Sequence, residues 1–153
     1  MHKTINSGIY ILEIRLVENI KVVLGKNKEF DLPQGYYYYV GSAQKNLQSR
    51  VNRHRTKNKK IHWHIDHITS NYFADVLTVY TFENAKKEFE CELRELIEKK
   101  FNLTHLIKNF GNSDCNKCES HLLYSKSPIE SLISYKSLLS LDNFNSLYIS
   151  TSF

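Results

Sequence analysis

Tyrosines and basic residues lie close together in the first third of this sequence. They are Tyr10, four consecutive tyrosines at 36–39, and Arg50 and His54 in a predicted helix. Residues four apart share a helix face, so Arg50 and His54 reach one site. A guanidinium is a permanent fork suited to a phosphate, and a phenol relays a proton if a nearby cation lowers its high pKa. These residue types suit phosphodiester hydrolysis, in which tyrosines activate or position water while the helix holds the phosphate.

Interleaved strands and helices are predicted to position these residues. Strands are expected over 8–16, 20–25, 36–42 and 75–82, the first two as a hairpin, with 27–35 as a turn-rich connection. Alternation puts Tyr37 and Tyr39 on one face of their strand and Tyr36 and Tyr38 on the other. Helices are expected from 47, with Asn46 as a cap, over 62–73, over 85–101 and from Pro128 to 144. Residues 109–124 are predicted to be turn-rich, and the serine-rich tail to be poorly ordered.

Length and composition favour a single domain. The chain has 153 residues, 41% of them hydrophobic, which is enough for one core. It has no apolar stretch of about 18 residues and no secretory signal, so no membrane partner is expected. Its three cysteines cannot all pair within one chain, which favours a reducing cytoplasm.

The charge distribution indicates a polyanionic partner. The formal net charge is +5, and no acidic residue interrupts the segment 45–60. This basic run is either a phosphate-facing surface or a solvated helix face and loop. The candidate contacts to nucleic acid are Lys45, Arg53, Arg55, Lys57, Lys59 and Lys60, with His62 and His64 after them.

Short motifs occur in an informative order. Gly-Ile-Tyr at 8–10 and Tyr-Val-Gly at 39–41 are weak signals alone and fit strand residues beside a turn. Together with Leu-x-x-Arg-x-x-x-His at 47–54 and a later glutamate-bearing helix, they resemble the GIY-YIG nucleases over residues 7–101. The segments "GIYILEI", "GYYYYVGSA", "RVNRH", "HWHID", "ECEL" and "FGNSDCNKCESHLLY" are similar to an uncharacterised, mainly archaeal branch of that superfamily. Some members of the branch are fused to the base-excision enzyme endonuclease III.

This resemblance implies a fold and a site. The implied fold is a small, mostly antiparallel sheet flanked by helices (α+β), here with an inserted strand between the two tyrosine motifs. Tyr10 and Tyr39 would lie beside the scissile phosphate, which Arg50 contacts with His54 nearby. One glutamate would hold a divalent cation, Mg²⁺ or Mn²⁺. Glu90 is favoured over Glu92 because the branch carries its acidic residue just before a cysteine.

The segment "HWHIDH" at 62–67 leaves several roles open. His62 and Asp66 would share a helix face, and the residue types suit a metal site. Structural hydrogen bonding around Trp63, DNA contact and positioning of the active site are the alternatives. A further hypothesis is a structural zinc site of Cys91, Cys115, Cys118 and His121, against ordinary buried thiols or a redox pair.

The sequence therefore predicts a metal-dependent DNA endonuclease. A nuclease domain is expected over residues 1–124 and a helical extension over 125–153. The fusions suggest damaged or abasic DNA as substrate and a base-excision repair partner. Restriction-type or structure-selective cleavage, a catalytically inert nucleic-acid-binding module and a zinc-stabilised interaction domain are the alternatives. The sequence does not indicate the oligomeric state.

Overall fold

The computed structural model describes residues 6–111, 119–129 and 149–150. Four helical segments and seven strands occur in this part of the chain. The helices are α1 (Leu47–Arg55), α2 (Asp66–Thr69), the short 3₁₀ turn η1 (Lys87–Phe89) and α3 (Glu90–Lys100). The strands are β1 (Gly8–Leu16), β2 (Ile20–Leu24), β3 (Lys28–Leu32), β4 (Gly35–Ala43), β5 (Ala74–Glu83), β6 (Leu122–Ser125) and β7 (Ile149–Ser150).

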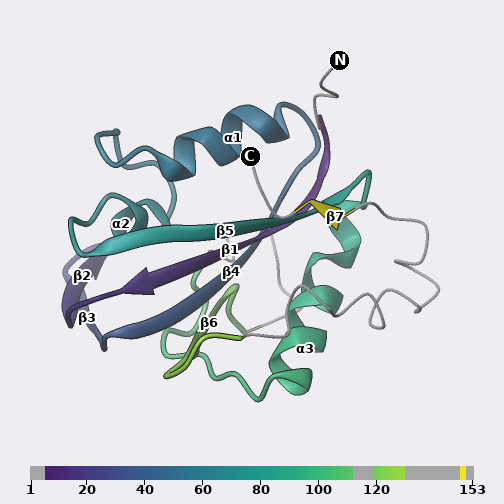
Figure 1. Ribbon diagram of the computed structural model, residues 1–153. Coiled ribbons are helices and arrows are strands. Elements are labelled where there is room, and N and C mark those ends of the chain that lie inside the picture. The colour runs from purple at the N-terminus through teal and green to yellow at the C-terminus, as the bar shows by residue number, and fades with distance from the viewer. Residues whose placement is uncertain (1–5, 112–118, 130–148, 151–153) are drawn as a thin grey trace.

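The main sheet is antiparallel, with strand order β6-β4-β1-β5-β7. Strand β1 is central and is buried at every position except Arg15, because it is covered on both faces. Helices α1 and α2 lie on one side of the sheet and α3 lies on the other (Figure 1). The α+β fold expected from the sequence is confirmed.

The two faces of the sheet form separate hydrophobic clusters. Tyr10, Tyr37 and Tyr39 belong to the cluster beneath α1 and α2. Tyr38 belongs to the cluster beneath α3. The predicted alternation of the four tyrosines is therefore confirmed, and only Tyr37 and Tyr39 can accompany Tyr10.

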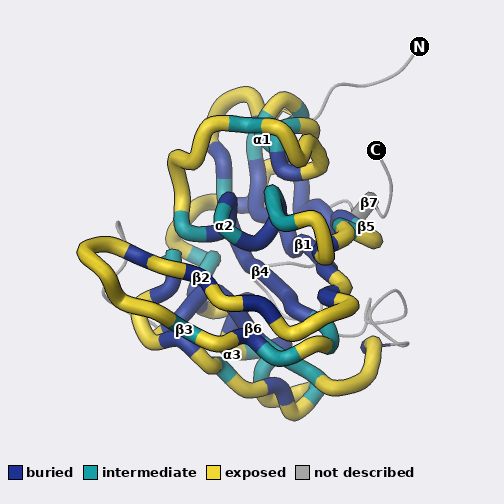
Figure 2. Tube along the Cα trace, turned by 90° about the vertical axis from the view of Figure 1, so that its left-hand side faces the viewer, coloured by how far each residue is buried: buried dark blue, intermediate teal, exposed yellow. Residues whose placement is uncertain are grey.

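The predicted hairpin of the first two strands is wrong. Strand β2 pairs with β3 in a separate two-stranded sheet, and residues 28–32, predicted as part of a turn-rich connection, form β3. Both edges of β1 are taken by β4 and β5, so β2 has no place beside it. The inserted segment is thus a whole hairpin, which packs inward through Ile20, Val22, Leu24 and Leu32 and is otherwise largely exposed (Figure 2).

Several boundaries also differ from the prediction. The helix expected over 62–73 is only the four residues of α2, because the Asp66 carboxylate binds the backbone N–H groups that precede it. Asn46 has a left-handed backbone (φ 57°) and makes no side-chain cap.

The expected long helix divides into η1 and α3, and part of the predicted turn-rich segment is strand β6. In the tail expected to be poorly ordered, Ile149 and Ser150 pair with β5. The predicted C-terminal helix lies almost entirely at 130–148, outside the described residues. No helix among the described residues is long and apolar enough to cross a membrane.

Candidate active site

A cleft of about 400 Å³ opens where β1, β4, α1 and the start of α3 meet the segment 62–64. All five residues predicted for catalysis line it: Tyr10, Tyr39, Arg50, His54 and Glu90. They come from four different elements and are brought together by the fold. His62 and His64 line the same cleft.

Tyr10 and Gly41 are directly opposite each other on β1 and β4. A Cβ atom added to Gly41 would lie 2.6 Å from the phenol oxygen of Tyr10, closer than real Cβ contacts. The phenol therefore lies across the glycine, and a side chain there would displace it. This contact gives a physical reason for the two separated tyrosine–glycine motifs to occur together.

Tyr10 and His54 form a buried pair. The Tyr10 hydroxyl lies 2.8 Å from Nε2 of His54. Burial and the neighbouring Tyr39 raise the pKa of Tyr10 well above its ordinary value, and the Arg50 guanidinium opposes this shift. A neutral phenol needs an acceptor for its O–H, so we assign Tyr10 as the donor to Nε2.

The His54 ring is neutral at pH 7. Burial, followed by the positive charge of Lys59, lowers the pKa of His54 to about 3. Because Nε2 accepts from Tyr10, the proton of this neutral ring is on Nδ1, which has no hydrogen-bond partner among the described residues. His54 is therefore a neutral acceptor for the phenolic proton.

Tyr39 and Arg50 line the cleft beside Tyr10. The Tyr39 ring centroid is 6.5 Å from that of Tyr10. Burial and then the Glu90 carboxylate raise the pKa of Tyr39, while Arg50 lowers it. Nη1 of Arg50 donates to the Ser42 carbonyl at 2.6 Å, which holds the guanidinium against β4.

Glu90 lies at the first position of α3 and points to the end of β4. The Ser42 hydroxyl donates to its Oε2 at 2.5 Å, and Nδ1 of His121 lies 2.6 Å from its Oε1. Nδ1 of His121 also lies 3.0 Å from the Val40 carbonyl, so both of these partners are acceptors and Nδ1 carries a proton. Glu92 is exposed and lies outside the cleft lining formed by the described residues.

The segment 62–66 is held by the buried carboxylate of Asp66. Arg53 donates to both of its oxygens at 2.9 Å, and the backbone N–H groups of His62 and Trp63 donate to Oδ2. Burial alone would raise the pKa of Asp66, but these hydrogen bonds outweigh it and the pKa is lowered. The structural hydrogen bonding expected for this motif is present, and it presents Trp63 and the two histidines to the cleft.

His64 is fixed in one tautomer. Its Nδ1 accepts the Gly111 N–H at 3.0 Å, so the neutral ring carries its proton on Nε2. Burial, followed by the charge of His67, lowers the pKa of His64. His64 is therefore a neutral hydrogen-bond donor at the cleft.

Most of the chain matches one protein family. The family model described as a domain of unknown function, DUF123, matches residues 9–140. The chain belongs to the DUF123 family. No curated protein and no solved structure matches it.

In this DUF123 protein, the predicted basic residues divide into two groups. Nζ of Lys59 lies inside and donates to the carbonyls of Arg53 and His54 and to the Thr69 hydroxyl, so it supports the fold. Arg53 is held by Asp66. The others are exposed at the surface: Lys45, Arg55, Lys57 and Lys60.

The proposed zinc ligands of the DUF123 chain fall partly outside the described residues. Cys115 and Cys118 lie there, so the four-ligand hypothesis is untested. Cys91 is buried on α3, and its sulfur is disulfide-bonded, a state in which it offers no thiolate. The described residues contain no group of three or more His, Cys, Asp or Glu side chains arranged to hold a metal.

Sequence reasoning missed the contacts that orient Glu90. Ser42 and His121 bind its two oxygens. The sequence predicts no role for Ser42, which belongs to the "GSA" segment, and it predicts His121 as a zinc ligand. No spacing rule relates residues 42, 90 and 121. The one sequence feature that could have indicated a role for Ser42 is its position directly after the tyrosine motif, at the end of a strand.

Proposed function

We propose that this protein is a metal-dependent DNA endonuclease of the GIY-YIG type, which hydrolyses phosphodiester bonds. The observation that supports this most is the convergence of Tyr10, Tyr39, Arg50, His54 and Glu90 on one cleft. These side chains provide phenols, a fixed cation, a neutral imidazole and a carboxylate within reach of one linkage. The order of the tyrosine motifs, the helix and the glutamate supports the same assignment.

Arg50 would bind the scissile phosphate. Its guanidinium is held by the Ser42 carbonyl through Nη1, which leaves further donors for phosphate oxygens. Negative charge increases on those oxygens during hydrolysis, so a fixed cation stabilises the transition state more than the ground state.

Tyr10 or Tyr39 would orient the attacking water, and would accept its proton only as a phenolate, the form that Arg50 stabilises. Both phenols are protonated at rest because burial raises the pKa of each. The Tyr10 proton already has an acceptor in His54, and Arg50 stabilises the phenolate form. With its hydrogen held towards His54, the Tyr10 oxygen can accept a hydrogen bond from the water and so orient it.

Glu90 would hold the divalent cation. Its carboxylate and the adjacent Ser42 hydroxyl are hard oxygen donors, which suit Mg²⁺ or Mn²⁺ with water and phosphate oxygens as the other ligands. The bound cation would neutralise developing charge on the phosphate and on the leaving oxygen. His121 and Ser42 orient the carboxylate from the protein side.

The exposed basic residues would supply affinity for DNA. Lys45, Arg55, Lys57 and Lys60 surround α1 and the loop after it, in a chain of net charge +5. Contacts of this kind do not depend on the DNA sequence. They weaken as the salt concentration rises, because each neutralised phosphate releases counterions. Action on damaged or abasic DNA with a base-excision repair partner, and a cytoplasmic location, remain predictions from the sequence.

The test is a cleavage panel. Intact, abasic, branched and single-stranded DNA are incubated with the protein, with and without Mn²⁺ or Mg²⁺. We expect metal-dependent cutting of at least one substrate, abolished in Glu90→Gln and retained in the matched control Glu92→Gln. An absence of cutting across the panel, with DNA still bound, would favour the inert binding module.

A further inference from the structure

The single tryptophan of the chain, Trp63, lines the cleft yet is 38% exposed. The guanidinium carbons of Arg50 and Arg53 lie 4.9 Å and 4.6 Å from its ring centroid. Within the described residues, its indole N–H has no hydrogen-bond partner. An aromatic ring, two guanidiniums that lie over it and an unused donor thus meet beside the candidate phosphate site.

The position of Trp63 is fixed by buried charge. Oδ2 of Asp66 accepts the Trp63 backbone N–H at 2.9 Å, and both Asp66 oxygens bind Arg53, which also lies over the ring. Asp66 is fully buried, so this network is expensive to desolvate. Its result is an exposed ring that is already ordered, and an ordered ring loses little conformational entropy on binding.

We propose that Trp63 and the guanidiniums that lie over it form a stacking platform for an unpaired nucleobase next to the phosphate bound at Arg50. This inference rests on the proposed function and narrows its substrate to single-stranded or locally unpaired DNA. Bases within a duplex stack on one another and cannot offer a face to the ring unless they are extruded. Aromatic rings and guanidinium planes accept an unpaired base of any type, and the indole N–H, which lies in the ring plane, can donate to a neighbouring group of the strand.

Arg50 links the two parts of the site. It lines the cleft beside Tyr10 and Glu90, and it also lies over the Trp63 ring. A phosphate held by its guanidinium would therefore have an adjoining base within reach of the ring. His62, whose ring centroid is 6.2 Å from that of Trp63, extends the same surface.

The test uses the intrinsic fluorescence of Trp63, because no other tryptophan contributes signal. Protein in EDTA is titrated with oligothymidylate of about 12 nucleotides, within the usual site size, and with a blunt duplex of similar length. Anisotropy of labelled DNA reports binding of each. We expect single strands to quench or shift the emission and to bind about tenfold more tightly than the duplex. Equal affinity for the two, or single-strand binding that leaves the emission unchanged, would overturn the proposal.

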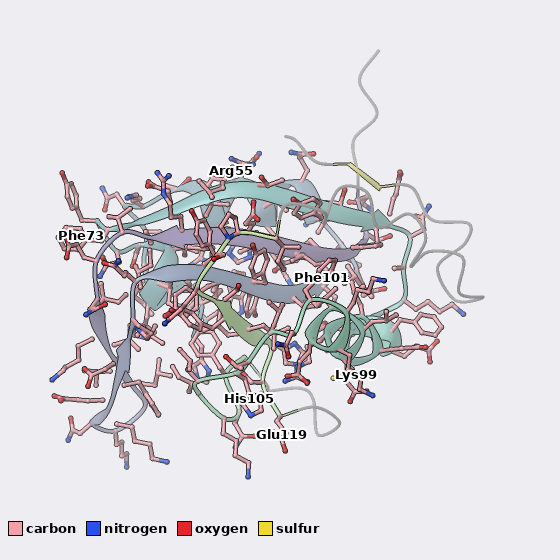
Figure 3. The ribbon with its side chains drawn as sticks, turned by 60° about the horizontal axis from the view of Figure 1, so that its bottom comes forward. Arg55, Phe73, Lys99, Phe101, His105 and Glu119 are labelled. Carbon is pink, nitrogen blue, oxygen red and sulfur yellow. The ribbon has the colours of Figure 1, made fainter. Side chains whose placement is uncertain are left out.

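Variants separate stacking from charge. Trp63→Leu is expected to weaken single-strand binding about tenfold and to leave duplex binding unchanged, while Trp63→Phe retains most of the affinity. The matched control is Phe73→Leu, because Phe73 is 39% exposed and lies outside the cleft, at the opposite end of the molecule from Lys99 and Phe101 (Figure 3). Thermal unfolding checks each variant. An equal loss on single strands and duplex in folded Trp63→Leu would overturn the proposal.

Failure of this inference can be distinguished from failure of the nuclease assignment. Binding is measured without metal, and cleavage is measured separately. Single-strand selectivity that depends on Trp63, without cutting under any metal, would support the platform and reject the nuclease. Metal-dependent cutting, together with single-strand binding that Trp63→Leu leaves unchanged, would support the nuclease and reject the platform.

Discussion

The two faces of the main sheet each carry a buried tyrosine with a polar partner, but the surroundings of the two hydroxyls differ. On the α3 face, the Tyr38 hydroxyl donates to Glu13 at 2.8 Å and accepts the Ile129 N–H at 2.9 Å. On the cleft face, the Tyr10 hydroxyl contacts His54, whose Nδ1 has no partner among the described residues. Tyr38 is enclosed, whereas Tyr10 lines a cleft that solvent or a substrate can enter.

The arginines of the two faces repeat this contrast. Arg94 on α3 is 4% exposed and donates to the Ser120 carbonyl at 2.6 Å and to Glu98 at 2.7 Å. Arg50 is partly exposed and donates to the Ser42 carbonyl at the edge of the cleft. The same residue types therefore stabilise the fold on one face and are available for chemistry on the other. Access to the cleft makes this difference, and residue type does not.

The largest expected difference in cutting rate is between the phenylalanine variants of Tyr10 and Tyr38. If Tyr10 is the tyrosine that acts on the water, Tyr10→Phe should lower the rate of DNA cutting by about 100- to 10,000-fold, because it removes the hydroxyl. Tyr38→Phe should leave cutting intact and lower the free energy of unfolding by about 1–3 kcal/mol, since Glu13 loses its donor. Single-turnover cleavage and urea unfolding measure the two effects. Equal rate losses in the two variants would remove the contrast between the faces.

Variants of Arg50 and Arg94 should differ in the same way, one in cutting rate and the other in stability. Arg50→Ala is expected to lower the cutting rate at least about 100-fold while DNA affinity stays within about tenfold, because the cation acts mainly on the transition state. Arg94→Met should retain cutting and destabilise the fold by about 1–3 kcal/mol through its lost hydrogen bonds. Unchanged cleavage in Arg50→Ala would show that the phosphate is held elsewhere.

The neutral His54 should make stability depend on pH. Its pKa is about 3 when folded and about 6.5 when unfolded, so below pH 6.5 the unfolded state binds a proton that the folded state does not. Stability is then lost as pH falls from about 6.5 towards 3, by up to about 1.4 kcal/mol per pH unit. Urea unfolding at several pH values should give a shallower slope for His54→Gln. Parallel curves for the two proteins would contradict the buried, neutral histidine.

The smallest effect is expected at the exposed basic surface. Lys60→Ala should weaken binding several-fold and lower the slope of log affinity against log salt by about one, the value for one phosphate contact. The comparison is Lys99→Ala, on the exposed end of α3 away from the cleft (Figure 3). Salt titration of DNA binding measures both, and identical slopes would place the DNA on another surface.

Periodicity and residue type alone determined much of this protein. Strand alternation separated Tyr37 and Tyr39 from Tyr36 and Tyr38, and helix spacing placed Arg50 beside His54, because side-chain direction is a local property of the backbone. Strand pairing was not local: β2 pairs with β3 since β4 and β5 occupy both edges of β1.

Only the tertiary structure decided which groups meet. Glu90 binds Ser42 and His121, which are 48 and 31 residues away in the chain, and Asp66 joins Arg53 to the segment before α2. The same packing encloses Lys59. The charge pattern alone places this residue with the exposed lysines and arginines. A sequence specifies the chemistry of each side chain, but its access to solvent and its partners depend on how distant segments pack, which no local pattern records.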